Sequence, residues 1–176
     1  MVTETLSRGE KIKLNLGAGH KRYDGMFNVD VLETYDPEIL CDLDVDGLPL
    51  PDSSCQVIIA DYVLEHVRDV LQTMQEIWRV CVNEAEIFVG VPYFGWAGAH
   101  KDPTHTHLFD VDSWKYWNSR DDSIPHYRFT GNFDLIKLDI ATHPDLDLVP
   151  DDQRDFAMKH FINMITKLNF YLKAVK

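Results

Sequence analysis

The sequence predicts an α/β fold with a mostly parallel β-sheet, and three features of the chain carry this prediction. Short apolar runs alternate with turns or helical segments from residue 12 to residue 91, as is typical of strands joined by right-handed crossovers. The first run ends in the turn Gly17-Ala18-Gly19, which allows a sharp bend and a close approach to a ligand. Acidic residues follow successive apolar runs, at the carboxyl ends of the predicted strands. Open α/β sheets bind their ligands at these ends.

Length and composition indicate a single globular domain over residues 1–176. Hydrophobic residues make up 45% and charged residues 26% of the chain, so disorder is not expected. The net charge of −12 disfavours sequence-independent binding of nucleic acid. No apolar run reaches membrane-spanning length and no signal-peptide pattern is present, so no membrane partner is expected. The three cysteines lack C-x-x-C spacing, which favours reduced thiols and a cytoplasmic location.

The first half of the chain predicts four strands and little helix. Alternating or continuous apolar residues predict strands at 11–16, 27–31, 39–43 and 56–60. A short helical turn is expected near residues 35–40. The segment 20–27 is too short for a helix with two turns, so the first crossover helix is expected to be reduced.

The second half of the chain contains the clearest helix, over residues 70–81. Its apolar residues follow helical spacing and Asp69 is placed to cap it; they are Val70, Leu71, Met74, Ile77, Trp78 and Cys81. Strands are predicted at 85–91 and 133–140, and a short helix from residue 112. Apolar residues from Phe156 to Leu172 also predict a C-terminal helix opening at Pro150-Asp151. This helix is expected to pack on the sheet, and a contact between two copies in a homodimer is the alternative.

A long segment over residues 92–120 is rich in aromatic residues, glycine and histidine. Long loops of this kind usually carry function rather than fill space. Tyr93, Trp96 and His100 are therefore candidates for contacts with a substrate.

Several motifs resemble those of class I S-adenosylmethionine (SAM)-dependent methyltransferases, in particular a small type 11-like group. The resemblance rests on the Leu-Glu-His element at 64–66 and the Asp-Pro-Thr-His element at 102–105. Further matching segments lie at 14–19, 28–30, 42–43, 48–52 and 76–80, in the order and spacing of the group. The resemblance implies a Rossmann-like class I methyltransferase sheet, in which the short segment 20–27 of this chain predicts a reduced first helix. The chain departs from the pattern where a third glycine is common, because His20 and Lys21 follow Gly19.

The resemblance also implies SAM as the cofactor and a role for each matching position. Gly17, Ala18 and Gly19 would line the methionine part, and Asp30, with Val31 beside it, would hold the ribose hydroxyls. The remaining positions would contact the adenine (Asp42, Leu43) or border the methyl and methionine groups (Asp61, Tyr62). A carboxylate suits a ribose because it accepts from both hydroxyls. We further expect Lys21 or Arg22 to help hold the methionine carboxylate.

A nicotinamide dinucleotide is the rival cofactor. Its fingerprint requires a third small residue in the turn and an acid about 20 residues further on. Here Arg22 occupies the third position, and Asp30 lies eleven residues after Gly19. These departures favour SAM.

The histidine-rich segment supplies the candidates for proton transfer. A hydroxyl or amine acceptor has to lose a proton, and histidine titrates near neutrality. His105 or His107 is therefore the expected general base, with Asp102 orienting it. The set His100, Asp102, His105 and His107 matches no standard metal-ligand spacing, so no metal is expected. For Glu65 and His66, a role in structural hydrogen bonding is expected at least as much as a role in catalysis.

These observations predict a SAM-dependent methyltransferase that acts on an oxygen or nitrogen nucleophile of a small-molecule or sugar-like acceptor. The alternative is a non-catalytic subunit of the same fold that binds or activates a partner. The intact glycines, together with Asp30 and Asp42, favour the enzyme.

Overall fold

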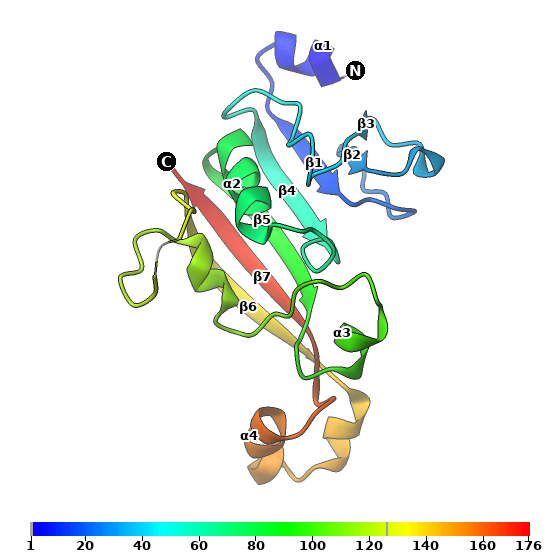
Figure 1. The fold of residues 1–176 in the computed structure, drawn as a ribbon, viewed down its shortest axis with the longest axis vertical. Coiled ribbons are helices and arrows are strands. Elements are labelled where there is room, and N and C mark those ends of the chain that lie inside the picture. Colours follow the sequence, from blue (N-terminus) through cyan, green and yellow to red (C-terminus); the bar gives the residue numbers. More distant parts are fainter. Residues whose placement is uncertain (1, 126) are drawn as a thin grey trace.

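The computed structural model describes residues 2–125 and 127–176 and is built on one seven-stranded sheet (Figure 1). The strand order is β3-β2-β1-β4-β5-β7-β6. The first five strands run parallel and β7 runs antiparallel between β5 and β6, which confirms the predicted mostly parallel sheet. The strands are β1 (Ile12–Leu16), β2 (Phe27–Asp30), β3 (Ile39–Leu40), β4 (Cys55–Asp61), β5 (Cys81–Pro92), β6 (Asn132–Thr142) and β7 (Ile165–Val175).

The helices are short. The α-helices are α1 (Val2–Ser7), α2 (Val70–Val80), α3 (Ala97–Lys101) and α4 (Asp151–His160), and the 3-10 helices are η1 (Glu33–Tyr35), η2 (Ser113–Trp117) and η3 (Pro144–Leu148). In the described part of the chain, no helix combines the length and apolar character needed to cross a bilayer.

Helix α2 forms where the sequence predicts it and lies against one face of the sheet (Figure 1). The Asp69 side chain caps it by accepting a hydrogen bond from the Gln72 N–H at 3.1 Å. Met74 and Ile77 belong to the same buried cluster as the strand residues Ile58 and Phe170. This apolar layer fixes the positions of the strand ends.

The connections in the first half of the chain are almost free of helix, as the short segment 20–27 predicts for the first of them. Residues 17–26 and 41–54, all of them described, form turns and irregular structure, and the connection from β2 to β3 holds only η1. In the second half of the sheet, strand residues that alternate with the buried ones are accessible. Ile136 and Tyr171 are exposed and Phe88 is half-buried. The sheet is thus thinly covered on one face.

The predicted C-terminal helix is wrong beyond its first ten residues. Helix α4 ends at His160, and residues 165–175 form strand β7 between β5 and β6. In β7, Leu168, Phe170 and Leu172 are buried and the residues between them are more exposed. Apolar residues four positions apart fit a helical period and a strand period equally. The pattern therefore predicts a helix where the chain forms a strand.

Candidate active site

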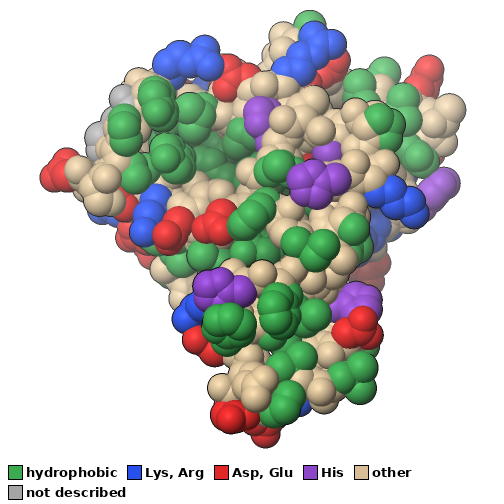
Figure 2. Space-filling view, turned by 60° about the horizontal axis from the view of Figure 1, so that its bottom comes forward, with side chains coloured by type: hydrophobic (Ala, Val, Ile, Leu, Met, Phe, Trp, Pro, Cys, Tyr) green, Lys and Arg blue, Asp and Glu red, His purple; other side chains and the backbone are tan. Residues whose placement is uncertain are grey.

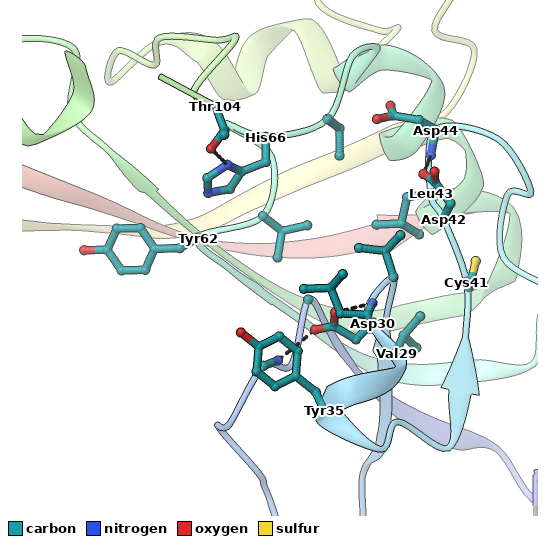
Figure 3. A pocket seen from close by; sticks show the side chains of 16 residues that line it. Val29, Asp30, Tyr35, Cys41, Asp42, Leu43, Asp44, Tyr62, His66 and Thr104 are labelled. Atoms are coloured by element: carbon teal, nitrogen blue, oxygen red, sulfur yellow. Dashed lines mark hydrogen bonds between the residues drawn. The ribbon is translucent and has the colours of Figure 1, made fainter. Parts of the chain in front are cut away.

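A cavity of about 570 Å³ opens at the carboxyl ends of β1, β2, β3 and β4. This volume is in the range of sites that hold small-molecule cofactors. In Figure 3, His66 and Thr104 lie on the opposite side of the cavity from Asp30 and Tyr35. Its lining includes Gly17, Gly19, Val29, Asp30, Val31, Tyr35, Asp42, Leu43, Asp44, Tyr62, Val63, His66 and Thr104.

The glycine turn after β1 forms part of the cavity floor. Gly17 and Gly19 have φ angles of +54° and +48°, which residues with a side chain rarely adopt. A Cβ atom at Gly17 would lie 2.7 Å from Cγ2 of Val63. Ala18 is buried between them and donates its N–H to the Val29 carbonyl at 3.1 Å. The turn therefore needs glycine at position 17 for both backbone and space.

Asp30 ends β2 with a buried and oriented carboxylate. Its Oδ2 atom accepts the Gly19 N–H at 2.8 Å, and its Oδ1 atom accepts the Leu32 N–H at 2.9 Å. A carboxylate has about four acceptor positions, so each oxygen can accept one further hydrogen bond. The two backbone bonds hold this acceptor pair at the cavity wall.

The loop after β3 supplies the third side of the cavity (Figure 3). Asp42 and Leu43 are half-buried. The Asp42 carboxylate accepts the Asp44 N–H at 2.9 Å, and the Asp44 carboxylate accepts the Arg68 N–H at 2.7 Å. These bonds hold the Asp42 and Asp44 carboxylates in place next to the apolar side chain of Leu43.

Asp61 and Tyr62 follow one another but point to different places. Tyr62 lines the cavity and has a left-handed φ of +60°, a strained conformation that is enriched at functional sites. Asp61, which is not among the cavity-lining residues described, forms ion pairs with Lys167 at 2.5 Å and Lys21 at 2.7 Å. Burial opposes ionisation of Asp61, but the hydrogen bonds from both lysines outweigh it and lower its pKa.

The two cations expected at the methionine carboxylate have other partners in the structure. The Lys21 ammonium binds Asp61. The Arg22 guanidinium donates to the carbonyls of Tyr35 and Asp36.

We expect Asp61→Asn to destabilise the protein by about 2 kcal/mol at pH 7, because it leaves the largely buried Lys167 ammonium without an anion. The pKa of Asp61 is lower in the folded than in the unfolded chain. Its stabilisation is therefore present above the unfolded value of about pH 4 and lost as pH falls through the folded value. Denaturant unfolding at pH 7 and at about pH 3 measures the difference.

Asp139→Asn is the matched control for this prediction. Asp139 forms a surface pair with Lys137 at 2.8 Å, and such pairs contribute about 0 to 1 kcal/mol. A loss at Asp61 that is no larger than the loss at Asp139, or that persists undiminished at low pH, would contradict the assigned role.

Among the described residues, His66 is the histidine that lines the cavity. Its Nδ1 atom lies 2.9 Å from Oγ1 of Thr104, and that hydroxyl donates to Asp102 at 2.6 Å. A hydroxyl has one proton, so Thr104 accepts from the Nδ1–H of His66, and the His66 Nε2 atom keeps its lone pair. Desolvation, followed by the nearby His105 ring, lowers the pKa of His66, which keeps the ring neutral at pH 7.

The three histidines of the histidine-rich segment after β5 differ in position. His105 lies behind His66, with ring centroids 4.7 Å apart, and its Nδ1 atom is 2.9 Å from the Ala99 carbonyl. The Nε2 atoms of His107 and His100 contact the carbonyls of Arg68 and Phe94, at 3.2 Å and 2.8 Å. The structure thus brings His105 to His66 but leaves the other two on the backbone.

The candidate substrate residues Tyr93, Trp96 and His100 are not among the described cavity-lining residues. The Tyr93 ring packs on Phe94, with centroids 4.6 Å apart, and the Trp96 ring lies over Gly98. Figure 2 shows the end of the molecule that carries α3 and α4, where histidine side chains are interspersed with hydrophobic ones. Tyr93 and Trp96 are half-buried, with Tyr93 packed against the core, and His100 is exposed.

Comparison with known proteins agrees with this geometry. Residues 18–89 match the family described as Methyltransferase domain. The YcgJ protein from Bacillus subtilis has a similar structure, with a TM-score of 0.60, 15% identity and coverage of 99% of this chain and 97% of that chain. A SAM-dependent methyltransferase from Archaeoglobus fulgidus has a TM-score of 0.60 at 13% identity, covering 98% and 92% of the two chains.

A third similar structure is a complex between the Haloferax volcanii Trm112 methyltransferase activator and a methyltransferase. Its TM-score is 0.56 at 13% identity, with coverage of 99% of this chain and 88% of that chain. Comparison with curated proteins gives no significant match.

The sheet order, the glycine turn and the acid at the end of β2 define a Rossmann-like methyltransferase fold. Residues 18–89 also match the family described as Methyltransferase domain, and a solved structure of the same fold is a SAM-dependent methyltransferase.

Proposed function

We propose that this chain transfers the methyl group of SAM to an oxygen or nitrogen nucleophile of a small-molecule or sugar-like acceptor. One observation carries the proposal: a single cavity has an oriented carboxylate, Asp30, on one side and a histidine with a free ring nitrogen, His66, on the other (Figure 3). The first group suits the cofactor and the second suits the nucleophile.

The residues of the cavity fit SAM by their chemistry. The Asp30 oxygens can each accept one ribose hydroxyl, the backbone at Gly17 and Gly19 leaves space for the methionine part, and Asp42 with Leu43 suits the adenine. Bound SAM supplies an electrophilic methyl group on a sulfonium ion, and the nearby Tyr62 ring favours a cation.

The acceptor is proposed to lie against Tyr62, His66 and Thr104. The His66 Nε2 atom accepts the hydrogen bond of the acceptor O–H or N–H and takes its proton. Thr104 and Asp102 are positioning residues, because they hold the His66 ring through the hydrogen bonds at 2.9 Å and 2.6 Å. Alignment of the nucleophile with the methyl group supplies much of the rate.

A small acceptor is favoured over nucleic acid by charge. The chain carries a net charge of −12, and Asp42 and Asp44 add local negative charge at the cavity. Phosphate backbones are repelled by such a surface.

The test is a screen of hydroxylated and amine-bearing metabolites with SAM, in which S-adenosylhomocysteine formation is measured. We expect turnover with at least one class of acceptor, and tight binding of SAM by calorimetry. Binding of SAM without turnover on any acceptor class, or no binding at millimolar SAM, would favour the non-catalytic alternative.

We expect Gly17→Ala to weaken SAM binding at least tenfold, because the added Cβ meets Val63 and pushes the cavity wall. The left-handed backbone adds about 1–2 kcal/mol of destabilisation. Isothermal titration with SAM measures the first effect and denaturant unfolding the second.

Gly25→Ala separates the two effects. Gly25 has a φ of +72° with nothing within 4 Å of an added Cβ. An alanine at this position therefore introduces the same kind of backbone strain as at Gly17, but no steric clash. Equal loss of SAM affinity in both variants would mean that space at Gly17 is not needed.

A further inference from the structure

Three side chains that can bind a metal converge beside the cavity. The ligand atoms of Glu65, His66 and His105 all lie within 4.8 Å of one another. They differ from the histidine set considered in the sequence, because Glu65 and His66 come from the loop after β4 and only His105 comes from the histidine-rich loop.

Glu65 is fully buried, and neither of its carboxylate oxygens has a hydrogen-bond partner among the described residues. Burial raises the pKa of Glu65 to about 7. A buried carboxylate without partners is costly, and buried polar groups of this kind often indicate an ion or a water. The His66 and His105 imidazoles lie close enough to Glu65 to bind one ion together with it.

Both imidazoles present the nitrogen that a metal would use. The Nδ1 atom of His66 donates to Thr104, which donates to Asp102, and the Nδ1 atom of His105 donates to the Ala99 carbonyl. Histidines that bind metals nearly always donate the other ring N–H to a carbonyl or carboxylate in this way. The Nε2 atom of each ring therefore keeps its lone pair, and the described residues show no hydrogen bond to either atom.

The loop carrying His105 is fixed against the segment carrying the other two residues. The Thr106 N–H donates to the Glu65 carbonyl at 2.7 Å, and its hydroxyl donates to the Val67 carbonyl at 2.8 Å. Ligand atoms around tetrahedral zinc lie about 3.4 Å apart, so small side-chain rotations close the present spacing.

We propose that Glu65, His66 and His105 form a binding site for one divalent first-row transition ion of the Zn²⁺ or Co²⁺ class, with its open coordination positions toward the cavity. Two imidazoles and one carboxylate are a common ligand set for such ions. The ion would occupy the His66 Nε2 lone pair, so in the metal-loaded protein the acceptor nucleophile would meet the ion instead of the imidazole. Binding of the ion itself does not depend on the proposed methyl transfer.

The test uses chelator-treated protein without SAM or acceptor. Co²⁺ is titrated while visible absorption is recorded, and Zn²⁺ is titrated by calorimetry. We expect one ion per chain, with affinity reduced at least 100-fold in Glu65→Gln and His105→Ala. Asp102→Asn, an exposed positioning residue, is expected to reduce affinity 10- to 100-fold, so one variant remains informative if Glu65→Gln fails to fold.

His107→Ala and His100→Ala are the matched controls, because these histidines belong to the same loop but bind backbone carbonyls. They are expected to keep wild-type ion affinity. The proposal is overturned if the wild-type chain binds no stoichiometric ion, if Glu65→Gln binds as tightly as wild type, or if the controls lose as much as His105→Ala. SAM affinity measured separately in metal-free buffer reports on the proposed function alone.

Discussion

Asp30→Asn is expected to weaken SAM binding at least 100-fold. The Asp30 carboxylate is expected to accept two ribose hydroxyls, and each charge-assisted hydrogen bond contributes about 1.5–3 kcal/mol. An amide has only one acceptor atom, so its NH₂ group would also face either the Gly19 N–H or the Leu32 N–H. Isothermal titration of SAM into the two proteins measures the loss.

Asp24→Asn is the control for charge. Asp24 is exposed and lies near the same turn, but it is not among the cavity-lining residues described, so its replacement removes one negative charge without touching the cavity. Its SAM affinity should stay within about twofold of wild type, in keeping with the small effect of exposed charges. Similar losses in both variants would show that net charge, rather than the Asp30 geometry, governs binding.

His66→Ala is expected to lower turnover by about 10²- to 10⁴-fold, the range typical of a lost proton acceptor, while SAM affinity changes by less than about threefold. The two effects separate because His66 lies across the cavity from Asp30 (Figure 3). Single-turnover rates and SAM titrations in metal-free buffer measure them.

His107→Ala is the comparison for this prediction, and it should retain nearly full turnover. Thr104→Val should cause an intermediate loss, because His66 then loses the partner of its Nδ1–H. Full turnover in His66→Ala, together with a large loss in His107→Ala, would return the general base to the position first expected from the sequence.

The parallel half of the fold could be predicted from sequence because its strands are continuous or alternating apolar runs. Helix α2 has a long amphipathic pattern and a capping aspartate, so its bounds differ from the prediction by one residue. The strand β7 could not be separated from a helix, because Leu168 and Leu172 satisfy both periods. Pairing with two neighbouring strands decided its form, and that information is not local.

The candidate site could likewise be predicted from the sequence only in part. The ends of the strands predict where Gly17, Asp30 and Asp42 lie, because parallel strands place their carboxyl ends together. The position of Asp61 could have been anticipated, since alternation sends its side chain to the face opposite Ala60. Which histidine lines the cavity could not have been anticipated. It depends on how a loop distant in sequence folds over His66, and on which ring nitrogen of each histidine binds a backbone carbonyl.

The thin cover on one face of the sheet has a thermodynamic consequence. Ile136 is 59% exposed and Tyr171 is 38% exposed, so unfolding transfers less new apolar surface to water than a sheet covered on both faces would. Apolar exposure dominates the heat-capacity change of unfolding. The stability of this chain should therefore vary less steeply with temperature than its length alone implies.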